Sequence, residues 1–343
     1  MAQRQDASPK LANRRRVLLQ WTTTILALPQ LVLAQPQRRF RIGIVWATDE
    51  AGVAQTGGAF LAALRELGYV QGKNLVVDVR HARGDNSRYP ALAEELIALK
   101  PDVLVGIESV AAVMKSKTST IPIVILAGPD PVAAGLVHSA SRPGTNVTGN
   151  AFRQDELIAK QIELLTEVAP GMSHVAFLNF ATTGEELFGG IAVRYEGFAR
   201  KAAAEKGLKL TVVAARDAAG LQKALAALEQ ARPQGLVVAS AGVMYQFRQE
   251  IIDAARRMRL PTISAFPPGW LQAGALLDYG PSFIKLYRNA ARMVDGIFRG
   301  AKPAEMPIEY PAVFELSVNL KTAREIGITI PPSIMLRADR VIQ

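Results

Sequence analysis

Residues 42–46 of this 343-residue chain read Ile42-Gly43-Ile44-Val45-Trp46, a continuous apolar run of the kind that forms a strand buried on both faces of a sheet. The stretch that follows predicts an amphipathic helix ending at Gly68, because glycine suits the C-terminus of a helix. The apolar stripe of this helix consists of Phe60, Leu61, Leu64 and Leu67. A buried strand followed by such a helix is the repeating unit of a parallel α/β sheet.

The same alternation continues along the chain. Further elements of the first series are expected as strands at 75–79, 103–107 and 121–126 and a helix at 90–99. A second series is expected as a helix near 154–168 and strands at 175–178, 210–213, 236–239 and 262–265. The sequence therefore predicts an α/β fold with two doubly wound parallel-sheet lobes in tandem.

The segment 141–151, rich in Gly, Pro, Asn and Thr, is the expected boundary between the lobes. The elements expected after the second series are a strand at 276–279, a long helix near 282–299, a strand at 314–318 and helical turns after Leu320. Elements added to a completed lobe suggest that the chain crosses back, and several crossings form a hinge over a cleft. The predicted domains are therefore 35–148 with about 280–311 for the first lobe, and 149–279 with about 312–343 for the second.

Residues 1–34 have the pattern of an export signal. Arg14-Arg15-Arg16 is a basic segment, residues 21–29 are apolar, and Val32-Leu33-Ala34 resembles a signal-peptidase site, so cleavage is expected near Ala34. The apolar stretch is short for a membrane span and is interrupted by Pro29. The paired arginines favour the twin-arginine route, and an ordinary secretion signal is the alternative. The protein is therefore expected in the periplasm.

The composition excludes several classes of function. With no cysteine, the chain is neither a lipoprotein nor a disulfide-stabilised scaffold. The formal net charge of +10 includes the arginine-rich N-terminus, and the scattered remainder does not indicate nucleic-acid binding. His81, His138 and His174 are far apart in sequence and have no metal-ligand spacing, so no metal is expected.

The motifs of the common enzyme classes are also missing from the sequence. The surroundings of Ser240 lack the first glycine of a nucleophile elbow, and neither a phosphate-binding loop nor a dinucleotide fingerprint follows a predicted strand. We therefore expect no catalytic residues, no cofactor and no enzymatic activity. An enzyme that uses the cleft between the lobes and a sensory or regulatory domain on the same fold are the alternatives.

Doubly wound sheets bind their ligands beyond the carboxyl ends of the strands, so the binding residues are expected at those ends. The candidates in the first lobe are Trp46, Thr48, Asp49, Glu108, Ser109, Gly128 and Asp130. The remaining candidates are Asn150 in the boundary segment and Phe180, Ser240, Ala241, Phe266, Asp278 and Tyr279 in the second lobe.

Together these residues suit a small polar or zwitterionic molecule. Ser109 is expected to be the N-cap of a helix whose first amides take a ligand carboxylate, or to cap the helix and nothing more. The aromatic candidates offer ring faces, with packing between elements as the alternative. The acidic candidates offer partners for an ammonium group, with turn formation as the alternative.

Several phrases distributed along the chain carry a resemblance to a known family. They are Arg41-Ile42-Gly43-Ile44, Leu67-Gly68-Tyr69-Val70-Gln71-Gly72-Lys73-Asn74, Lys100-Pro101-Asp102-Val103, Ile121-Pro122-Ile123-Val124, Asp130-Pro131-Val132, Arg142-Pro143-Gly144-Thr145-Asn146, Tyr279-Gly280-Pro281-Ser282 and Asn319-Leu320-Lys321-Thr322-Ala323. With them the chain resembles the ABC-transporter substrate-binding proteins related to the tryptophan/tyrosine-type periplasmic binding proteins.

The resemblance implies a type I periplasmic-binding fold with three hinge crossings and a single small-molecule ligand between the lobes. It also implies a monomer that docks in its closed form onto an ABC permease in the inner membrane. The chain departs from the common family pattern at Ala241, where an acidic residue is frequent, and at Glu108-Ser109, where Thr-Pro or Ser-Pro is usual. We therefore expect the periplasmic solute-binding protein of an ABC importer for a small organic solute that is amino-acid-like or aromatic.

Overall fold

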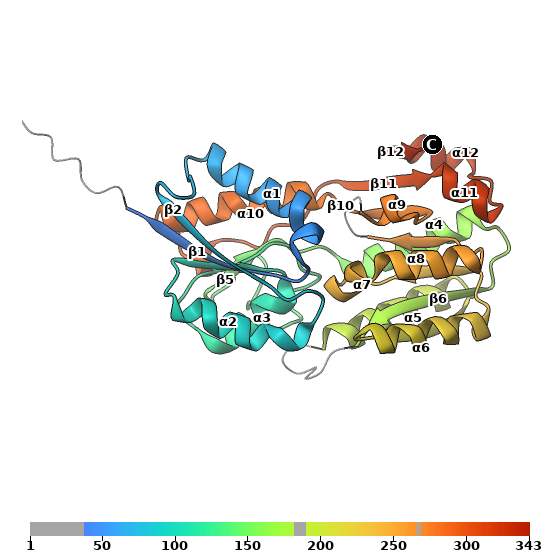
Figure 1. Ribbon diagram of the computed structural model, residues 1–343, viewed down its shortest axis with the longest axis horizontal. Coiled ribbons are helices and arrows are strands. Elements are labelled where there is room, and N and C mark those ends of the chain that lie inside the picture. The colour runs from blue at the N-terminus through green and yellow to red at the C-terminus, as the bar shows by residue number, and fades with distance from the viewer. Residues whose placement is uncertain (1–37, 182–189, 266–268) are drawn as a thin grey trace, which may run out of the picture. The chain divides into compact units, whose positions relative to one another are not determined.

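The structure is a computed structural model that describes residues 38–181, 190–265 and 269–343. These residues form two β-sheets, and Figure 1 shows helices on both sides of each sheet. The predicted signal peptide at 1–34 and the candidate residue Phe266 lie outside the described residues. By its contacts Arg38–Gln343 forms one compact unit.

The first sheet has five parallel strands in the order β2-β1-β3-β4-β5. Its strands are β1 Phe40–Trp46, β2 Leu75–His81, β3 Val103–Gly106, β4 Ile123–Ile125 and β5 Val147–Gly149. Helices α1 Glu50–Glu66 and α10 Phe283–Phe298 cover one face, and α2 Tyr89–Ala98 and α3 Glu108–Lys117 cover the other (Figure 1).

The alternation of side chains along β1 explains this layering. Ile42, Ile44 and Trp46 point to the α1 and α10 side, where they join an apolar cluster with Phe60. Val45 points to the opposite side and joins the cluster that contains Leu96 of α2. Because both faces are covered by helices, an uninterrupted apolar run is the pattern that such a strand requires.

The second sheet has seven strands in the order β12-β11-β10-β9-β8-β6-β7. Its strands are β6 His174–Phe180, β7 Lys209–Ala215, β8 Gly235–Val238, β9 Thr262–Ser264, β10 Leu277–Pro281, β11 Phe314–Asn319 and β12 Arg340–Ile342. All neighbouring pairs are parallel except β10 and β11, which are antiparallel.

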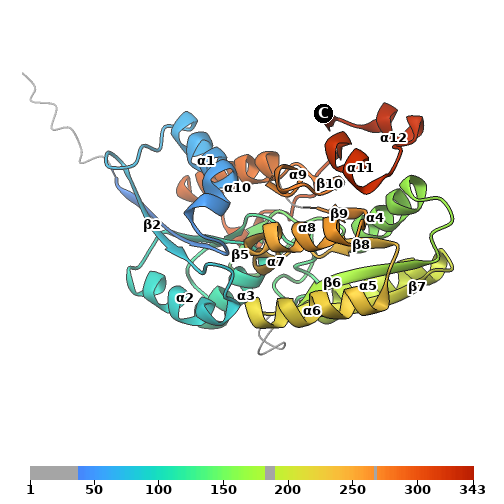
Figure 2. The ribbon, with the colours of Figure 1, turned by 45° about the vertical axis from the view of Figure 1, so that its right-hand side comes forward.

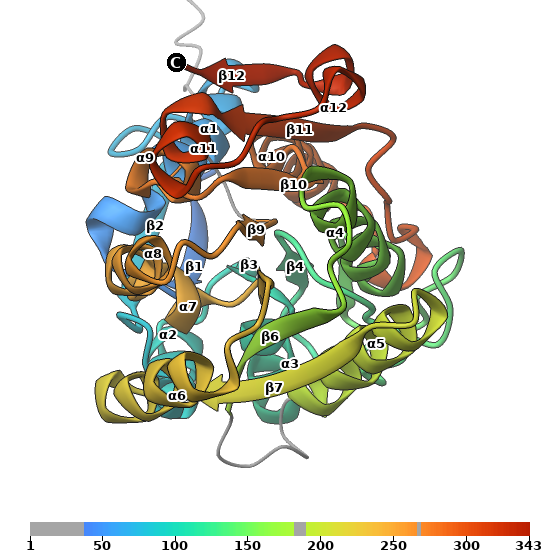
Figure 3. The same ribbon diagram turned by 90° about the vertical axis from the view of Figure 1, so that its right-hand side faces the viewer.

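Helices also cover both faces of the second sheet. In Figure 3, α4 Gln154–Val168 and α5 Ile191–Glu205 lie on one side of the strands, and α6 Ala218–Ala231, α8 Arg248–Arg257 and α9 Gly269–Ala273 lie on the other. Figure 2 shows the short helix α7 Gly242–Gln246 next to α8. The C-terminal helices are α11 Leu320–Ile326 and α12 Pro332–Arg337.

The chain passes between the two sheets three times: after β5, after β10 and before β11. Helix α10 follows a strand of the second sheet but packs against α1 on the first sheet. At the first passage, Gly149 has a φ of +142°, and a Cβ there would lie 2.4 Å from the backbone of Ile125. Only glycine therefore fits where the chain leaves the first sheet.

The predicted fold class of two parallel-dominated α/β sheets is confirmed. Three details differ from the prediction: β5 lies inside the segment assigned to the boundary loop, β12 lies in the region assigned to helical turns, and β11 runs antiparallel to β10. Strands β5 and β12 have three residues each, which is too short to show a periodicity of apolar residues. The direction of β11 depends on the path of the chain between β10 and β11, where helix α10 packs on the first sheet.

Among the residues that the structure describes, no helix is both long and apolar enough to cross a membrane.

Candidate ligand-binding site

A cavity of about 50 Å³ lies where the carboxyl ends of strands from both sheets face each other. The first sheet contributes residues after β3 and β4, and the second sheet contributes the end of β6 and residues after β8. The lining consists of Asn86, Tyr89, Ile107, Glu108, Ser109, Ala127, Gly128, Pro129, Phe152, Phe180, Ile191, Tyr195, Ser240, Ala241, Gly242 and Phe283. Six of the predicted binding residues are therefore brought together here: Glu108, Ser109, Gly128, Phe180, Ser240 and Ala241.

Glu108 is the buried acid of this cavity, with 2% of its surface exposed. Its Oε2 accepts a hydrogen bond of 2.9 Å from the backbone N–H of Asp130. Its Oε1 lies 3.4 Å from Nη2 of Arg194, which comes from helix α5 of the second sheet. Burial raises the pKa of Glu108 to about 8, and the Asp130 N–H and the Arg194 charge oppose this rise.

Gly128 makes room for the carboxylate. A Cβ at this position would lie 2.5 Å from Oε2 of Glu108 and 2.6 Å from its Cβ. The backbone of the β4 loop can therefore approach Glu108 closely, which brings the Asp130 N–H within hydrogen-bond distance.

The two serines of the cavity differ in their partners. Ser109 hydrogen-bonds with the phenol of Tyr89, whereas the buried Oγ of Ser240 has no partner among the described residues. The prediction that Ser109 is the N-cap is wrong, because α3 begins at Glu108 and Ile107 occupies the cap position. A buried hydroxyl without a partner is unusual in folded proteins and indicates a place where a ligand or water is bound.

Aromatic rings form much of the remaining wall. Phe180 meets Tyr195 of α5 edge to face with ring centroids 5.6 Å apart, and Phe152 meets Phe283 of α10 at 6.2 Å. Burial raises the pKa of the Tyr195 phenol, and the nearby Glu108 contributes in the same direction. These rings provide an apolar surface next to the carboxylate of Glu108.

Three candidates at the end of β1 lie outside the lining of this cavity. Trp46 is buried and stacks on Tyr287 of α10, with ring centroids 6.0 Å apart. Asp49 caps α1 by accepting a hydrogen bond of 2.9 Å from the Gly52 N–H, and its other oxygen lies 3.5 Å from Nε2 of Gln246. Thr48 is buried beside Asp49.

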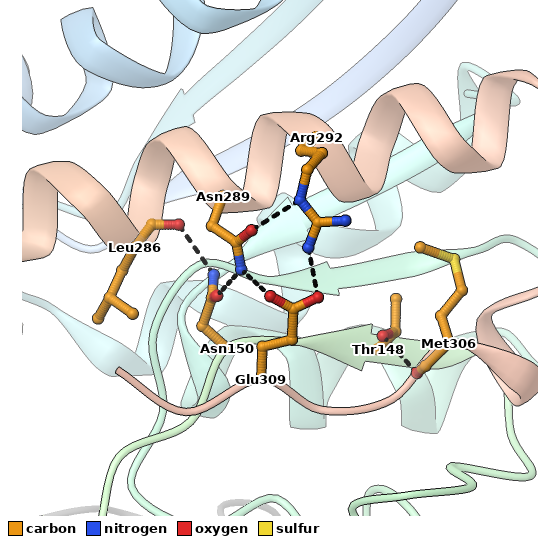
Figure 4. Close-up of polar contacts among 7 residues, drawn as sticks. All are labelled: Thr148, Asn150, Leu286, Asn289, Arg292, Met306 and Glu309. Atoms are coloured by element: carbon orange, nitrogen blue, oxygen red, sulfur yellow. Dashed lines mark hydrogen bonds and ion pairs between the residues drawn. The ribbon is translucent and has the colours of Figure 1, made fainter. Parts of the chain in front are cut away.

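Asn150 is held in a polar network beside helix α10, drawn in Figure 4. Its Nδ2 donates to the carbonyls of Leu126 and Leu286 at 3.0 and 2.9 Å, and its Oδ1 accepts from Asn289 at 2.7 Å. Asn289 also donates to Glu309 at 2.8 Å, and Arg292 pairs with Glu309. The network joins the end of β5, helix α10 and the segment that returns toward β11.

The other candidates are positioned elsewhere. Asp130 accepts hydrogen bonds from the N–H groups of Val132 and Ala133 at 3.1 and 3.0 Å, which closes the turn after β4. The ring of Tyr279 stacks on Phe314 with centroids 5.9 Å apart. Asp278 lines a second cavity of about 480 Å³ beside β10 and β11, and burial raises its pKa well above the ordinary value.

Several other residues of the cavity do not follow a predicted strand, and the sequence did not indicate them. Tyr89, Ile191, Tyr195 and Phe283 lie in or next to helices, and Arg194 reaches Glu108 from α5. Their apolar or charged character resembles that of ordinary helix residues, so no sequence signal separates them from residues of the core. The described residues contain no group of three or more His, Cys, Asp or Glu side chains placed to hold a metal ion.

A family model described as ABC transporter substrate binding protein matches residues 41–342. A tyrosine-binding protein of Clostridioides difficile (strain R20291) is 24% identical over 293 residues, which cover 84% of this chain and 81% of that protein. Two crystal structures are also similar, and each match covers 89% of this chain and 100% of the chain in the crystal structure. One is a conserved domain protein from Vibrio cholerae, 26% identical with a TM-score of 0.81. The other is an ABC domain from Streptococcus pneumonia in complex with L-Trp, 22% identical with a TM-score of 0.77.

These similarities extend over both sheets and show the type I periplasmic-binding fold that the sequence resemblance implied. The family match spans nearly all of the described chain. The chain therefore belongs to the family of ABC transporter substrate-binding proteins.

Proposed function

We propose that this chain is the periplasmic substrate-binding protein of an ABC importer. It captures one small organic solute, amino-acid-like or aromatic, between its two sheets and delivers it unaltered to a permease in the inner membrane. The observation that carries this proposal is the cavity itself, which is built from the strand ends of both sheets. It contains the buried Glu108 and the Ser240 Oγ, for which the described residues provide no partner.

The chemistry of the lining supports this class of solute. Phe152, Phe180 and Phe283 provide ring surfaces on which an aromatic or branched apolar group packs. One relative is named for binding tyrosine, and one structure of the same fold holds L-Trp. Both names agree with a solute that combines an apolar body with charged or polar groups.

In this proposal the two sheets are the two lobes of a clamp. Residues 35–148 and about 280–311 form one lobe, and 149–279 and about 312–343 form the other, so three connections act as the hinge. The cavity volume of about 50 Å³ is far below the roughly 300 Å³ of a small ligand pocket, so the lobes must separate to admit a solute. A solute that contacts both lobes then stabilises the closed form, which the permease recognises.

The proposal includes export. A signal peptide at 1–34 places the protein in the periplasm, and mass spectrometry of periplasmic protein should give a chain that begins at or near Gln35. Recovery of the full-length chain only from the cytoplasm would contradict this part of the proposal.

The binding part is tested on the mature chain by calorimetry and small-angle scattering with L-Trp, L-Tyr and benzoate as first probes, followed by a metabolite library. We expect about one site per chain and a more compact particle when the solute is bound. Mass spectrometry of the solute after incubation separates the alternatives, because a cleft enzyme consumes its solute and a binding protein returns it unchanged. If no solute in the library binds, the proposal is wrong.

A further inference from the structure

The charge of the cavity comes from a single side chain. Among its described lining residues, Glu108 is the one carboxylate, and none is a lysine, arginine or histidine. Arg194 approaches Glu108 from α5 but does not line the cavity. Of the side chains that the structure describes, a solute inside the cavity therefore meets a carboxylate and no basic group.

The residues that the structure describes leave the hydrogen bonds of this carboxylate incomplete. An ionised carboxylate has about four acceptor positions. Glu108 has one N–H donor at 2.9 Å and one guanidinium nitrogen at 3.4 Å, which is longer than the roughly 2.7–2.9 Å of a strong charged hydrogen bond. A buried carboxylate in this situation is stabilised by any further donor that enters the cavity.

A second polar group lines the cavity from the other sheet. The buried Oγ of Ser240 has no hydrogen-bond partner in the described part of the chain, whereas Ser109 is bonded to Tyr89. Glu108 begins helix α3, which packs on the first sheet, and Ser240 follows β8 of the second sheet. The two residues therefore contribute from the two sides of the proposed clamp. The wall between them is formed largely by apolar and aromatic side chains.

We propose that the cavity selects solutes that carry a primary ammonium group on a short apolar or aromatic body, with the ammonium bound by Glu108. Ser240 binds a second polar group of the solute, such as a carboxylate or hydroxyl. This inference rests on the proposed function and specifies its solute. Where Glu108 is ionised, a solute whose only charged group is a carboxylate is disfavoured, because it would bring a second negative charge next to Glu108 in a site of low polarity.

The affinity should depend on pH through Glu108. The titratable and charged groups near it are Arg194 and Tyr195 of α5, Asp130 after β4, and Tyr310 in the returning segment. The pKa of Glu108 is raised to about 8 by burial, and a bound ammonium favours the ionised form and expels the proton. Binding should therefore strengthen as the pH rises from 6 toward 8, and this trend should vanish in Glu108→Gln.

Two sets of probes with matched apolar bodies test the inference by calorimetry at pH 8. The first contains L-phenylalanine, 2-phenylethylamine and 3-phenylpropanoate, and the second contains L-leucine, 3-methylbutylamine and 4-methylpentanoate. We expect the ammonium-bearing members to bind at least tenfold more tightly than the carboxylate-only members. Glu108→Gln should weaken their binding at least tenfold, and Glu108→Asp should restore part of it.

Glu95→Gln is the matched control, because Glu95 belongs to an exposed ion pair with Arg80 in the same lobe and lies outside the cavity lining. Its affinities should equal those of the wild type. Circular dichroism and the melting temperature show whether each variant is folded. Ser240→Ala should lower the affinity for the amino acids several-fold while leaving the affinity for the simple amines nearly unchanged.

Tight binding of a carboxylate-only probe, or unchanged affinity in a folded Glu108→Gln variant, would overturn the inference and leave the proposed function standing. If neither set binds, the metabolite library decides. Hits that all contain an ammonium group support the inference, and hits that lack one overturn it. A library without any hit counts against the proposed function as well.

Discussion

The network around Asn150 and the polar groups of the cavity differ in how well their hydrogen bonds are satisfied. Asn150 uses its amide nitrogen twice and its amide oxygen once, in contacts of 2.7 to 3.0 Å. In the cavity, the Ser240 Oγ has no partner among the described residues and Glu108 has one short hydrogen bond and one long ion pair. A satisfied buried network maintains the structure, whereas an incomplete one leaves positions for a ligand.

The largest effect is expected from breaking the satisfied cluster. Asn150→Ala removes the donor to the carbonyls of Leu126 and Leu286 and the acceptor of Asn289, so the free energy of unfolding should fall by about 3 kcal/mol. Urea denaturation measures this loss. If stability is unchanged and solute affinity is lost, Asn150 is a ligand contact, as the sequence analysis expected, and the contrast between the clusters is wrong.

The pH dependence of stability probes the incomplete cluster. The pKa of Glu108 is raised to about 8 in the folded protein. At pH values between the ordinary pKa of a glutamate and 8, the folded state therefore binds more protons than the unfolded state. Without solute, stability should therefore fall as the pH rises from 6 to 8, with a Glu108 contribution of at most about 1.4 kcal/mol per pH unit.

Glu108→Gln removes this contribution, and the difference between its denaturation curves and those of the wild type isolates it. Asp278 also has a raised pKa, but it is present in both proteins and affects both similarly. Identical pH profiles for the two proteins would show that Glu108 is not buried as described.

A smaller effect is expected from Gly128→Ala, which places a methyl group against the Glu108 carboxylate. The added Cβ would lie 2.5 Å from Oε2, so we expect a loss of about 1–2 kcal/mol in stability and weaker solute binding. Gly58→Ala is the control, because a Cβ there meets nothing within 4 Å. In helix α1 it should stabilise the protein by about 0.5–1 kcal/mol. Equal effects of the two substitutions would mean that Gly128 has no role in seating Glu108.

The smallest change in stability is expected from Ser240→Ala, and its sign is informative. The substitution removes a buried hydroxyl that has no partner among the residues of the described ranges. The stability of the solute-free protein should therefore stay unchanged or rise by up to about 1 kcal/mol, while solute affinity falls. Thermal denaturation and calorimetry on the same preparation measure both quantities. A loss of stability without a loss of affinity would indicate that Ser240 has a structural partner.

Much of the fold could be predicted from the sequence because its signals are local. The run at 42–46 gives β1, and the helix predicted near 154–168 is α4 Gln154–Val168. Short elements could not be predicted, since three residues such as Val147–Gly149 contain too few apolar positions to define a period. The antiparallel pairing of β10 and β11 is a tertiary property, because α10 must first pack on the other sheet.

The candidate binding residues also divide into those that line the cavity and those whose place elsewhere depends on tertiary packing. Glu108, Ser109, Gly128, Phe180, Ser240 and Ala241 were found because they follow or end predicted strands, and such positions gather at one edge of a parallel sheet. Trp46, Asp49 and Asn150 satisfy the same rule, but they respectively stack on a ring of α10, cap α1 and join the polar network beside α10. Whether a strand-end residue lines the cavity depends on which neighbouring residues its side chain contacts. The position of a residue at the end of a strand does not contain that information.

The sequence by itself therefore determined the α/β class, the family and the set of strand ends among which a binding site had to lie. These are consequences of local periodicity and of the geometry that all parallel sheets share. Only the tertiary structure decided that Glu108 lies beside Gly128 and Arg194 and that no described residue provides a partner for the Ser240 Oγ. The polarity of a buried site depends on contacts between segments far apart in the chain, and those contacts exist only after the two sheets have packed together.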